Sequence, residues 1–242
     1  MSLSIESDTE APKSRIVEIA QNVRNASLAR VRIGVAGNGG SFSEEAALAY
    51  AKKQHAKFGD KSMFAVIEVV WLITVEAVLA ALAAREIDMG VFAVMNNHGG
   101  AVRENLEAMA EHRWRPAMGS DGLPETVTLP VRHMLMTRPG LEGREVETIV
   151  TQLQAYEQCK RTIRTKWPNA TVLLYADTAT AAKHLSDGSL AEKFPGLSLE
   201  GTAVVGPEGC ATVNGLSVKE RDLQDYPDNK TTFVIALPQE KN

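Results

Sequence analysis

The chain has 242 residues, of which 44% are hydrophobic and 23% are charged, and it carries a formal net charge of −4. These values are typical of a soluble globular protein and exclude collagen-like, disordered and membrane-embedded classes. Residues 69–84 form the longest apolar stretch, but Glu76 interrupts it, so it indicates a strand end and a buried helix rather than a membrane span. The acidic balance and the lack of a Lys/Arg stripe argue against nucleic acid as a partner.

Cysteine and histidine usage limits the chemistry further. Cys159 and Cys210 lack CxxC spacing, and the N-terminus shows no basic-then-apolar signal pattern, which together favour the reducing cytoplasm. The five histidines include no metal-ligand spacing such as HExxH. We therefore predict no metal site and no cofactor.

Residues 1–30 are predicted to form a polar tail followed by a short helix. Ser14 can cap this helix, and its apolar stripe comprises Ile16, Val17, Ile19, Ala20 and Val23. From residue 31 onward, strands and helices alternate. Apolar runs predict strands at residues 31–36, 63–69 and 89–95, and helices at residues 42–53, 74–84 and 102–112. This order implies a parallel sheet covered on both faces.

The second half begins with a Pro/Gly-rich connection at residues 116–124 and a run at 126–137 that can cross between two lobes. Further alternation predicts strands at residues 148–150, 171–175, 202–205 and 231–237, and helices at residues 153–164, 178–185 and 207–213. We predict a two-lobed, periplasmic-binding-protein-like α/β fold in which each lobe is a mostly parallel sheet flanked by helices. Residues 31–115 would form lobe 1 and residues 116–237 lobe 2, with the chain end 238–242 able to return to lobe 1. Ligands of such folds bind in the cleft between strand ends.

A glycine-rich turn follows the strand at residues 31–36. Residues 37–45 read GNGGSFSEE, and Ser41 and Glu44 have the spacing of a capping box at the start of a helix. The amides of such a turn can bind a carboxylate. Taken by itself, the pattern is better explained by an ordinary strand-to-helix turn, because neither GxGxxG nor a Walker sequence is completed.

Polar side chains also gather in two later segments. Asn96, Asn97 and His98 precede a Gly pair, where Asn commonly forms turns and a single His more often lies on the surface. Residues 225–233 form a turn that leads into an apolar strand, and Thr231 and Thr232 fit that strand without any functional reason. None of the three segments alone identifies a reaction.

The order and separation of these segments resemble the prephenate dehydratase family from Arg32 to Leu237. The matches to its motifs are Gly37, Gly40, Phe42 and Ser43 with Ser41 in a Thr place, Asn96 of Glu-Asn-Ser, His133 of a crossing strand, Gln154, Ala155, Gln158 and Cys159 of the Ser-His-Pro-Gln-Ala segment, Thr178, Ala179, Ala181 and Ala182 of an Ala-rich helix, and Asn229, Thr231 and Phe233 of Asn-x-Thr-Arg-Phe. The family commonly has a C-terminal regulatory domain that binds phenylalanine, and we expect this chain to lack it.

The resemblance implies a lyase that releases carbon dioxide and the ring hydroxyl from prephenate, giving phenylpyruvate on the route to phenylalanine. By resemblance, Thr231 is the catalytic proton donor or positioner, acting within a hydrogen-bonded network. The amides of the turn at residues 37–43 and a set of side chains would hold this small dicarboxylate. These substrate-binding residues are Ser41, Phe42, Asn96, Asn97, Gln154, Asn229, Thr232 and Phe233. We also expect a homodimer.

The chain departs from the family pattern at several positions. Thr232 replaces Arg, Met95 replaces Glu, Gln152 replaces His and Asn97 replaces Ser. Loss of the guanidinium removes a contact worth about 1.5–3 kcal/mol, which a cation elsewhere could replace. The candidates are Arg103, Arg132, Arg161 and Arg164. Two alternatives therefore stay open: a non-aromatising prephenate decarboxylase, and a non-catalytic protein that binds a small carboxylate.

Overall fold

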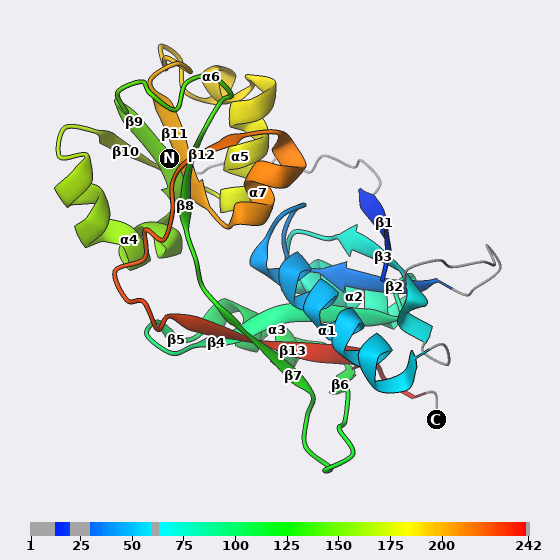
Figure 1. The fold of residues 1–242 in the computed structure, drawn as a ribbon. Coiled ribbons are helices and arrows are strands. Elements are labelled where there is room, and N and C mark those ends of the chain that lie inside the picture. The colour runs from blue at the N-terminus through cyan, green and yellow to red at the C-terminus, as the bar shows by residue number, and fades with distance from the viewer. Residues whose placement is uncertain (1–12, 20–29, 60–62, 241–242) are drawn as a thin grey trace.

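The computed structural model describes residues 13–19, 30–59 and 63–240. These residues form two lobes, each built on one sheet (Figure 1). The described strands form an eight-stranded sheet of order β1-β3-β2-β4-β13-β6, with β5 beside β4 and β7 beside β13, and a five-stranded sheet of order β10-β9-β11-β8-β12. The two-lobed α/β fold predicted from the sequence is confirmed.

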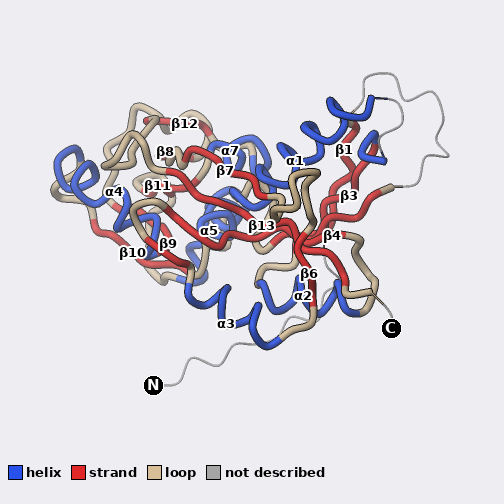
Figure 2. Tube along the Cα trace, turned by 90° about the horizontal axis from the view of Figure 1, so that it is seen from below, coloured by secondary structure: helices blue, strands red, loops and turns tan. Residues whose placement is uncertain are grey.

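The first lobe contains the larger sheet and three α-helices among its described residues. The strands are β1 Ser14–Glu18, β2 Val31–Val35, β3 Val66–Trp71, β4 Met89–Asn96, β5 Gly100–Ala101, β6 Trp114–Pro116, β7 Thr126–Pro130 and β13 Lys230–Pro238; a 3-10 turn covers Met63–Ala65. The helices are α1 Phe42–Phe58, α2 Val75–Ala83 and α3 Arg103–Glu111. Helix α1 covers one face of the sheet, and α2 and α3 cover the other (Figure 2).

The second lobe contains the smaller sheet. Its strands are β8 Met134–Thr137, β9 Thr148–Gln152, β10 Thr171–Tyr175, β11 Thr202–Gly206 and β12 Ser217–Glu220, and its helices are α4 Leu153–Lys166, α5 Thr178–Asp187, α6 Leu190–Lys193 and α7 Glu208–Asn214. All residues of β11 are buried, which is typical of a strand covered on both faces.

Each sheet has a parallel core with antiparallel strands beside it. In the first sheet β2 pairs in parallel with β3 and β4, and in the second β9 pairs in parallel with β10 and β11. Strand β13 is antiparallel to β4, and β8 is antiparallel to β11. The sheets are therefore mixed, whereas the sequence predicts mostly parallel ones. In α/β sheets of this kind, the helices that follow parallel strands begin at the same edge.

Two segments differ from their predicted places. Residues 14–18 form a strand, not a helix, because they pair antiparallel with β3 along its open edge. Ala20 and Val23 of the predicted helix lie outside the described residues. Strands β7 and β13 belong to the first sheet, although the sequence places residues 116–237 in the second lobe. Within the described residues, the chain crosses between the lobes at residues 131–133 and 221–229.

The lobes also touch at the turn that precedes α1. Gly40 lies against Gly209 at the start of α7, so closely that a Cβ on Gly40 would come within 2.5 Å of the Gly209 carbonyl carbon. Beside this contact, Asn38 Nδ2 donates a hydrogen bond of 2.5 Å to Thr180 Oγ1 of α5. The absence of a side chain at both glycines is what allows the two backbones to approach.

Candidate active site

A cavity of about 470 Å³ lies between the lobes. Both lobes contribute to its wall. The first lobe provides Ser41, Phe42, Thr231 and Phe233, and the second provides Gln152, Gln154, Gln158, Asp177 and Thr178. The crossing segment 131–133 adds His133. Five of the predicted site residues thus meet in one place: Ser41, Phe42, Gln154, Thr231 and Phe233.

Helices α1, α2, α3, α4 and α5 all place residues of their first turn in the cavity wall. A helix N-terminus carries partial positive charge and unpaired amides, so it favours a bound carboxylate. Helices α3 and α4 have no side-chain cap, which leaves their first amides available. The cavity can therefore hold an anionic group without a cationic side chain.

The turn before α1 is fixed by its own hydrogen bonds. Ser41 Oγ accepts from the Glu44 amide at 3.3 Å, and Glu44 Oε2 accepts from the Gly40 amide at 2.6 Å. The Ser41 amide donates to the Asn38 carbonyl at 3.1 Å. The Ser41 half of the predicted capping box is thus present, while Glu44 accepts from the residue before the N-cap rather than from the N-cap itself. The amides of Gly40 and Ser41 are already paired, contrary to the expectation that the whole turn holds the substrate. The amides of Phe42 and Ser43 take no part in these contacts.

Thr231 is held by a buried amide. Strand β13 pairs Thr231 with Asn96 of β4, and Asn96 Nδ2 donates to Thr231 Oγ1 at 2.9 Å and to Asn229 Oδ1 at 2.7 Å. Asn96 Oδ1 in turn accepts from the amides of His98 and Gly99. Because the Thr231 oxygen accepts from Asn96, its own proton is free to donate into the cavity.

Asn96 and Asn229 are each 1% exposed and lie behind Thr231 rather than in the cavity wall. Asn97 Oδ1 accepts from the Lys230 amide at 2.6 Å, and Thr232 Oγ1 lies 3.0 Å from Thr128 Oγ1. Asn97 and Thr232 therefore lie outside the cavity, contrary to the sequence-based expectation. For Thr232 the reason is the alternation of side chains along a strand, which turns it away from the face that carries Thr231.

His133 lies in the cavity wall, at the end of the crossing segment 131–133. His133 is 2% exposed, and its Nε2 is 2.8 Å from Gln158 Oε1. Its ring packs T-shaped against the Phe42 ring, with the two ring centroids 5.5 Å apart. Burial lowers the pKa of His133 to about 4, so the imidazole is neutral at pH 7. Neither His133 nor Gln158 was among the predicted site residues, although their matches to the family motifs could have indicated both.

Ile73 contributes a strained backbone to the rim of the cavity. Its φ is 63°, in the left-handed region that β-branched residues strongly disfavour, and its side chain is 49% exposed. Such a conformation costs on the order of 1–3 kcal/mol and tends to occur at functional sites. The sequence gives no signal for it.

Residues 33–241 match the family model described as prephenate dehydratase. The chain belongs to the prephenate dehydratase family. It is 27% identical over 169 residues to prephenate dehydratase of Bacillus subtilis, a match that covers 69% of this chain and 54% of the relative. It is 25% identical over 206 residues to arogenate dehydratase/prephenate dehydratase 1 of Arabidopsis thaliana, which covers 85% of this chain and 45% of the relative. The chain spans about half the length of these relatives.

A solved structure supports the fold. Prephenate dehydratase of Arthrobacter aurescens, in complex with L-Phe, superposes with a TM-score of 0.66 at 24% identity, and the match covers 87% of this chain and 61% of that one. At this identity the likeness establishes the shared two-lobed fold.

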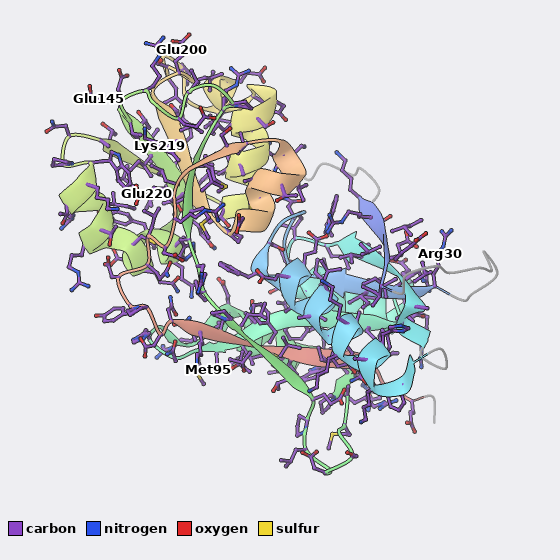
Figure 3. The ribbon with its side chains drawn as sticks, viewed as in Figure 1. Arg30, Met95, Glu145, Glu200, Lys219 and Glu220 are labelled. Atoms are coloured by element: carbon purple, nitrogen blue, oxygen red, sulfur yellow. The ribbon has the colours of Figure 1, made fainter. Side chains whose placement is uncertain are left out.

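The cavity wall carries acidic side chains. Its acidic wall residues are Glu76, Glu104 and Asp177, and no Lys or Arg lines it within the described part of the chain. Arg103, Arg132, Arg161 and Arg164 all lie outside the wall. Met95, which replaces the Glu of the family pattern, is 47% exposed and projects from β4 away from the second lobe (Figure 3). The lost family cation therefore has no replacement among these residues.

Proposed function

We propose that the protein is a carbon–oxygen lyase of the prephenate dehydratase type, which converts prephenate to phenylpyruvate. The observation that carries this proposal is the Thr231 hydroxyl, whose oxygen is held by Asn96 and whose proton is free to point into a cavity between two lobes. Membership of the family supports the same reaction.

In the proposed reaction, the ring carboxylate leaves as carbon dioxide, and the electron pair of the broken C–C bond enters the ring. The C–O bond of the ring hydroxyl then breaks, and the departing oxygen takes the Thr231 proton and leaves as water. Thr231 regains a proton from solvent. Aromatisation supplies the driving force, so the protein mainly has to position the substrate and deliver one proton.

The carboxylates of the substrate would lie at the helix N-termini. Phe42 and Ser43 at the start of α1 and Gln154 at the uncapped start of α4 line the cavity from opposite lobes, so the amides of these first turns are the candidate donors. Preorganised amides of this kind stabilise negative charge in a site that excludes water. Gln154, on the first turn of α4, adds a side-chain amide that can donate or accept.

The test compares two neighbouring threonines. Purified wild type, Thr231→Val and Thr232→Val are incubated with prephenate, and ultraviolet absorbance and product mass are followed. We expect phenylpyruvate from the wild type, a loss of about 100-fold or more in kcat for Thr231→Val, and a change of less than about threefold for Thr232→Val. Full activity of Thr231→Val would contradict the assigned role.

The same assay separates the alternatives. A decarboxylated product without aromatic absorbance would assign a non-aromatising decarboxylase. Saturable binding without turnover would assign a carboxylate-binding protein. The homodimer and the cytoplasmic location stay predictions, which light scattering and cell fractionation can test.

A further inference from the structure

The edge strand β1 presents an arginine to the first turn of α1. Pairing with β3 sets Arg15 opposite Val69. Because side chains alternate along a strand, Arg15 and Val17 point to the same face of the sheet, and Val17 packs there against the core that contains Ala46 and Ala47 of α1. The family model matches residues 33–241, so this arginine comes from a strand outside the matched region.

Arg15 pairs with a carboxylate that is closed to solvent. Arg15 Nη2 lies 2.8 Å from Glu44 Oε1, and the Glu44 side chain is 2% exposed whereas that of Arg15 is 40% exposed. The second carboxylate oxygen, Glu44 Oε2, accepts from the Gly40 amide at 2.6 Å. A carboxylate that leaves water without a cation nearby loses its hydration at a high cost. Arg15 therefore offsets the cost of keeping Glu44 where it can hold Gly40.

Gly40 fixes the turn that borders the cavity. Its φ is 86°, a conformation that glycine adopts readily. The two residues that follow it, Ser41 and Phe42, line the cavity, and its own backbone lies against Gly209 of the second lobe. A shift of Gly40 would therefore move the cavity wall and disturb the contact between the lobes at the same time.

We propose that Arg15 is a positioning residue of the candidate active site. Through Glu44 it holds the Gly40 amide, and with that amide the turn that carries Ser41 and Phe42. Arg15 does not line the cavity, so it acts without touching the substrate. The kinetic consequence rests on the proposed function, whereas the hydrogen bond from Gly40 to Glu44 can be tested without a substrate.

The kinetic test compares wild type, Arg15→Gln, Arg15→Lys and the control Arg32→Gln with prephenate as substrate. Arg32 is a matched control, because it is 39% exposed, lies 3.7 Å from Asp88 and does not line the cavity. We expect kcat/KM to fall about tenfold in Arg15→Gln, since misplaced binding groups are costly, and to stay within about twofold of wild type in Arg32→Gln. Arg15→Lys keeps the charge and should restore about half of the activity. Equal losses in Arg15→Gln and Arg32→Gln, corrected for the folded fraction, would overturn the proposal.

A second background tests whether Arg15 acts through Glu44. In Glu44→Gln there is no buried charge for Arg15 to offset. Arg15→Gln should therefore lower kcat/KM about tenfold in the wild-type background and add little to whatever Glu44→Gln alone has lost. The same loss in both backgrounds would show that Arg15 acts by another route and would overturn the proposal.

Amide exchange provides a readout that needs no turnover. In protein labelled with isotopic glycine, magnetic resonance follows the Gly40 amide directly. We expect this amide to exchange with solvent about tenfold faster in Arg15→Gln than in wild type, and at the wild-type rate in Arg32→Gln. An unchanged Gly40 rate in Arg15→Gln would overturn the proposal. If wild type does not convert prephenate, the proposed function fails, while faster exchange in Arg15→Gln would still support the role of Arg15 in holding the turn.

Discussion

The side-chain amide of Asn96 donates a hydrogen bond of 2.9 Å to the hydroxyl oxygen of Thr231, directly across the β4–β13 ladder. The same amide spans two further acceptors, Asn229 Oδ1 and the Lys230 carbonyl. Asn96 therefore both stabilises the first lobe and orients the hydroxyl of Thr231, the proposed proton donor. Changing this residue should affect both properties at once.

We expect Asn96→Ala to lower the free energy of unfolding by about 2 kcal/mol or more, because buried partners lose their hydrogen bonds. We also expect kcat to fall while KM changes less, since the Thr231 hydroxyl loses its orientation. Urea denaturation and steady-state kinetics measure the two effects. Asn169→Ala, at an exposed position, is the control and should stay within about 0.5 kcal/mol of the wild type.

The buried His133 ring should make stability depend on pH. Burial lowers its pKa to about 4 from 6.5, so between these values the unfolded chain binds a proton that the folded chain does not. The contribution is fully present above pH 6.5, and the free energy of unfolding should fall by up to about 1.4 kcal/mol per pH unit as pH drops toward 4. Urea denaturation at several pH values should show that the free energy of unfolding depends less steeply on pH in His133→Gln than in the wild type. Parallel curves for the two proteins would rule out this role.

The contact between Gly40 and Gly209 should be intolerant of any side chain. A Cβ on Gly209 would lie 2.9 Å from the Gly40 carbonyl oxygen, so Gly209→Ala must push the lobes apart. We expect kcat/KM to fall about tenfold or more because a small misplacement of catalytic groups is costly. Small-angle scattering should show a larger radius of gyration. Gly143→Ala, where a Cβ meets nothing within 4 Å, should leave both quantities unchanged.

Strain at Ile73 predicts a stabilising substitution. Ile73→Gly should raise the free energy of unfolding by about 1 kcal/mol, because glycine adopts positive φ readily and the exposed side chain contributes little burial. Ile73→Ala removes most of the same side chain but keeps a Cβ, so the backbone stays strained. Its free energy of unfolding should therefore rise less than that of Ile73→Gly. Thermal unfolding of the two variants distinguishes backbone strain from side-chain loss. A less stable Ile73→Gly would show that the side chain packs usefully at the rim.

Local patterns in the sequence predict much of this fold. The alternation of apolar runs and helix signals places most helices and strands of both lobes close to their observed bounds, because each of these elements is specified by its own residues. The sequence predicts no separate element at β5, β6, α6 or β12, and it predicts the wrong type of element at β1. Ile16 and Val17 fit a helix stripe or a strand equally well, and only pairing with β3 decides between them. Such a contact depends on residues about fifty positions away.

Site prediction failed where it needed tertiary pairing. Thr231 and Phe233 reach the cavity and Thr232 does not, which follows from the side-chain alternation of β13 once its orientation is known. The sequence also could not show that β13 returns to the first sheet beside β4. Among the described residues, the absence of a cation from the cavity wall and of a partner for His133 Nδ1 depends on how the lobes meet, which no local pattern describes.

The position of β13 has a consequence for how the protein folds during synthesis. This strand lies between β4 and β6 in the first sheet, yet its residues 230–238 follow the whole second lobe along the chain. The second lobe, residues 134–220, is continuous and has its own buried core, so it can form as soon as it leaves the ribosome. The sheet of the first lobe stays incomplete between β4 and β6 until β13 has been synthesised. Thr231 enters with that strand, so the cavity acquires its proposed proton donor at the step that closes the fold.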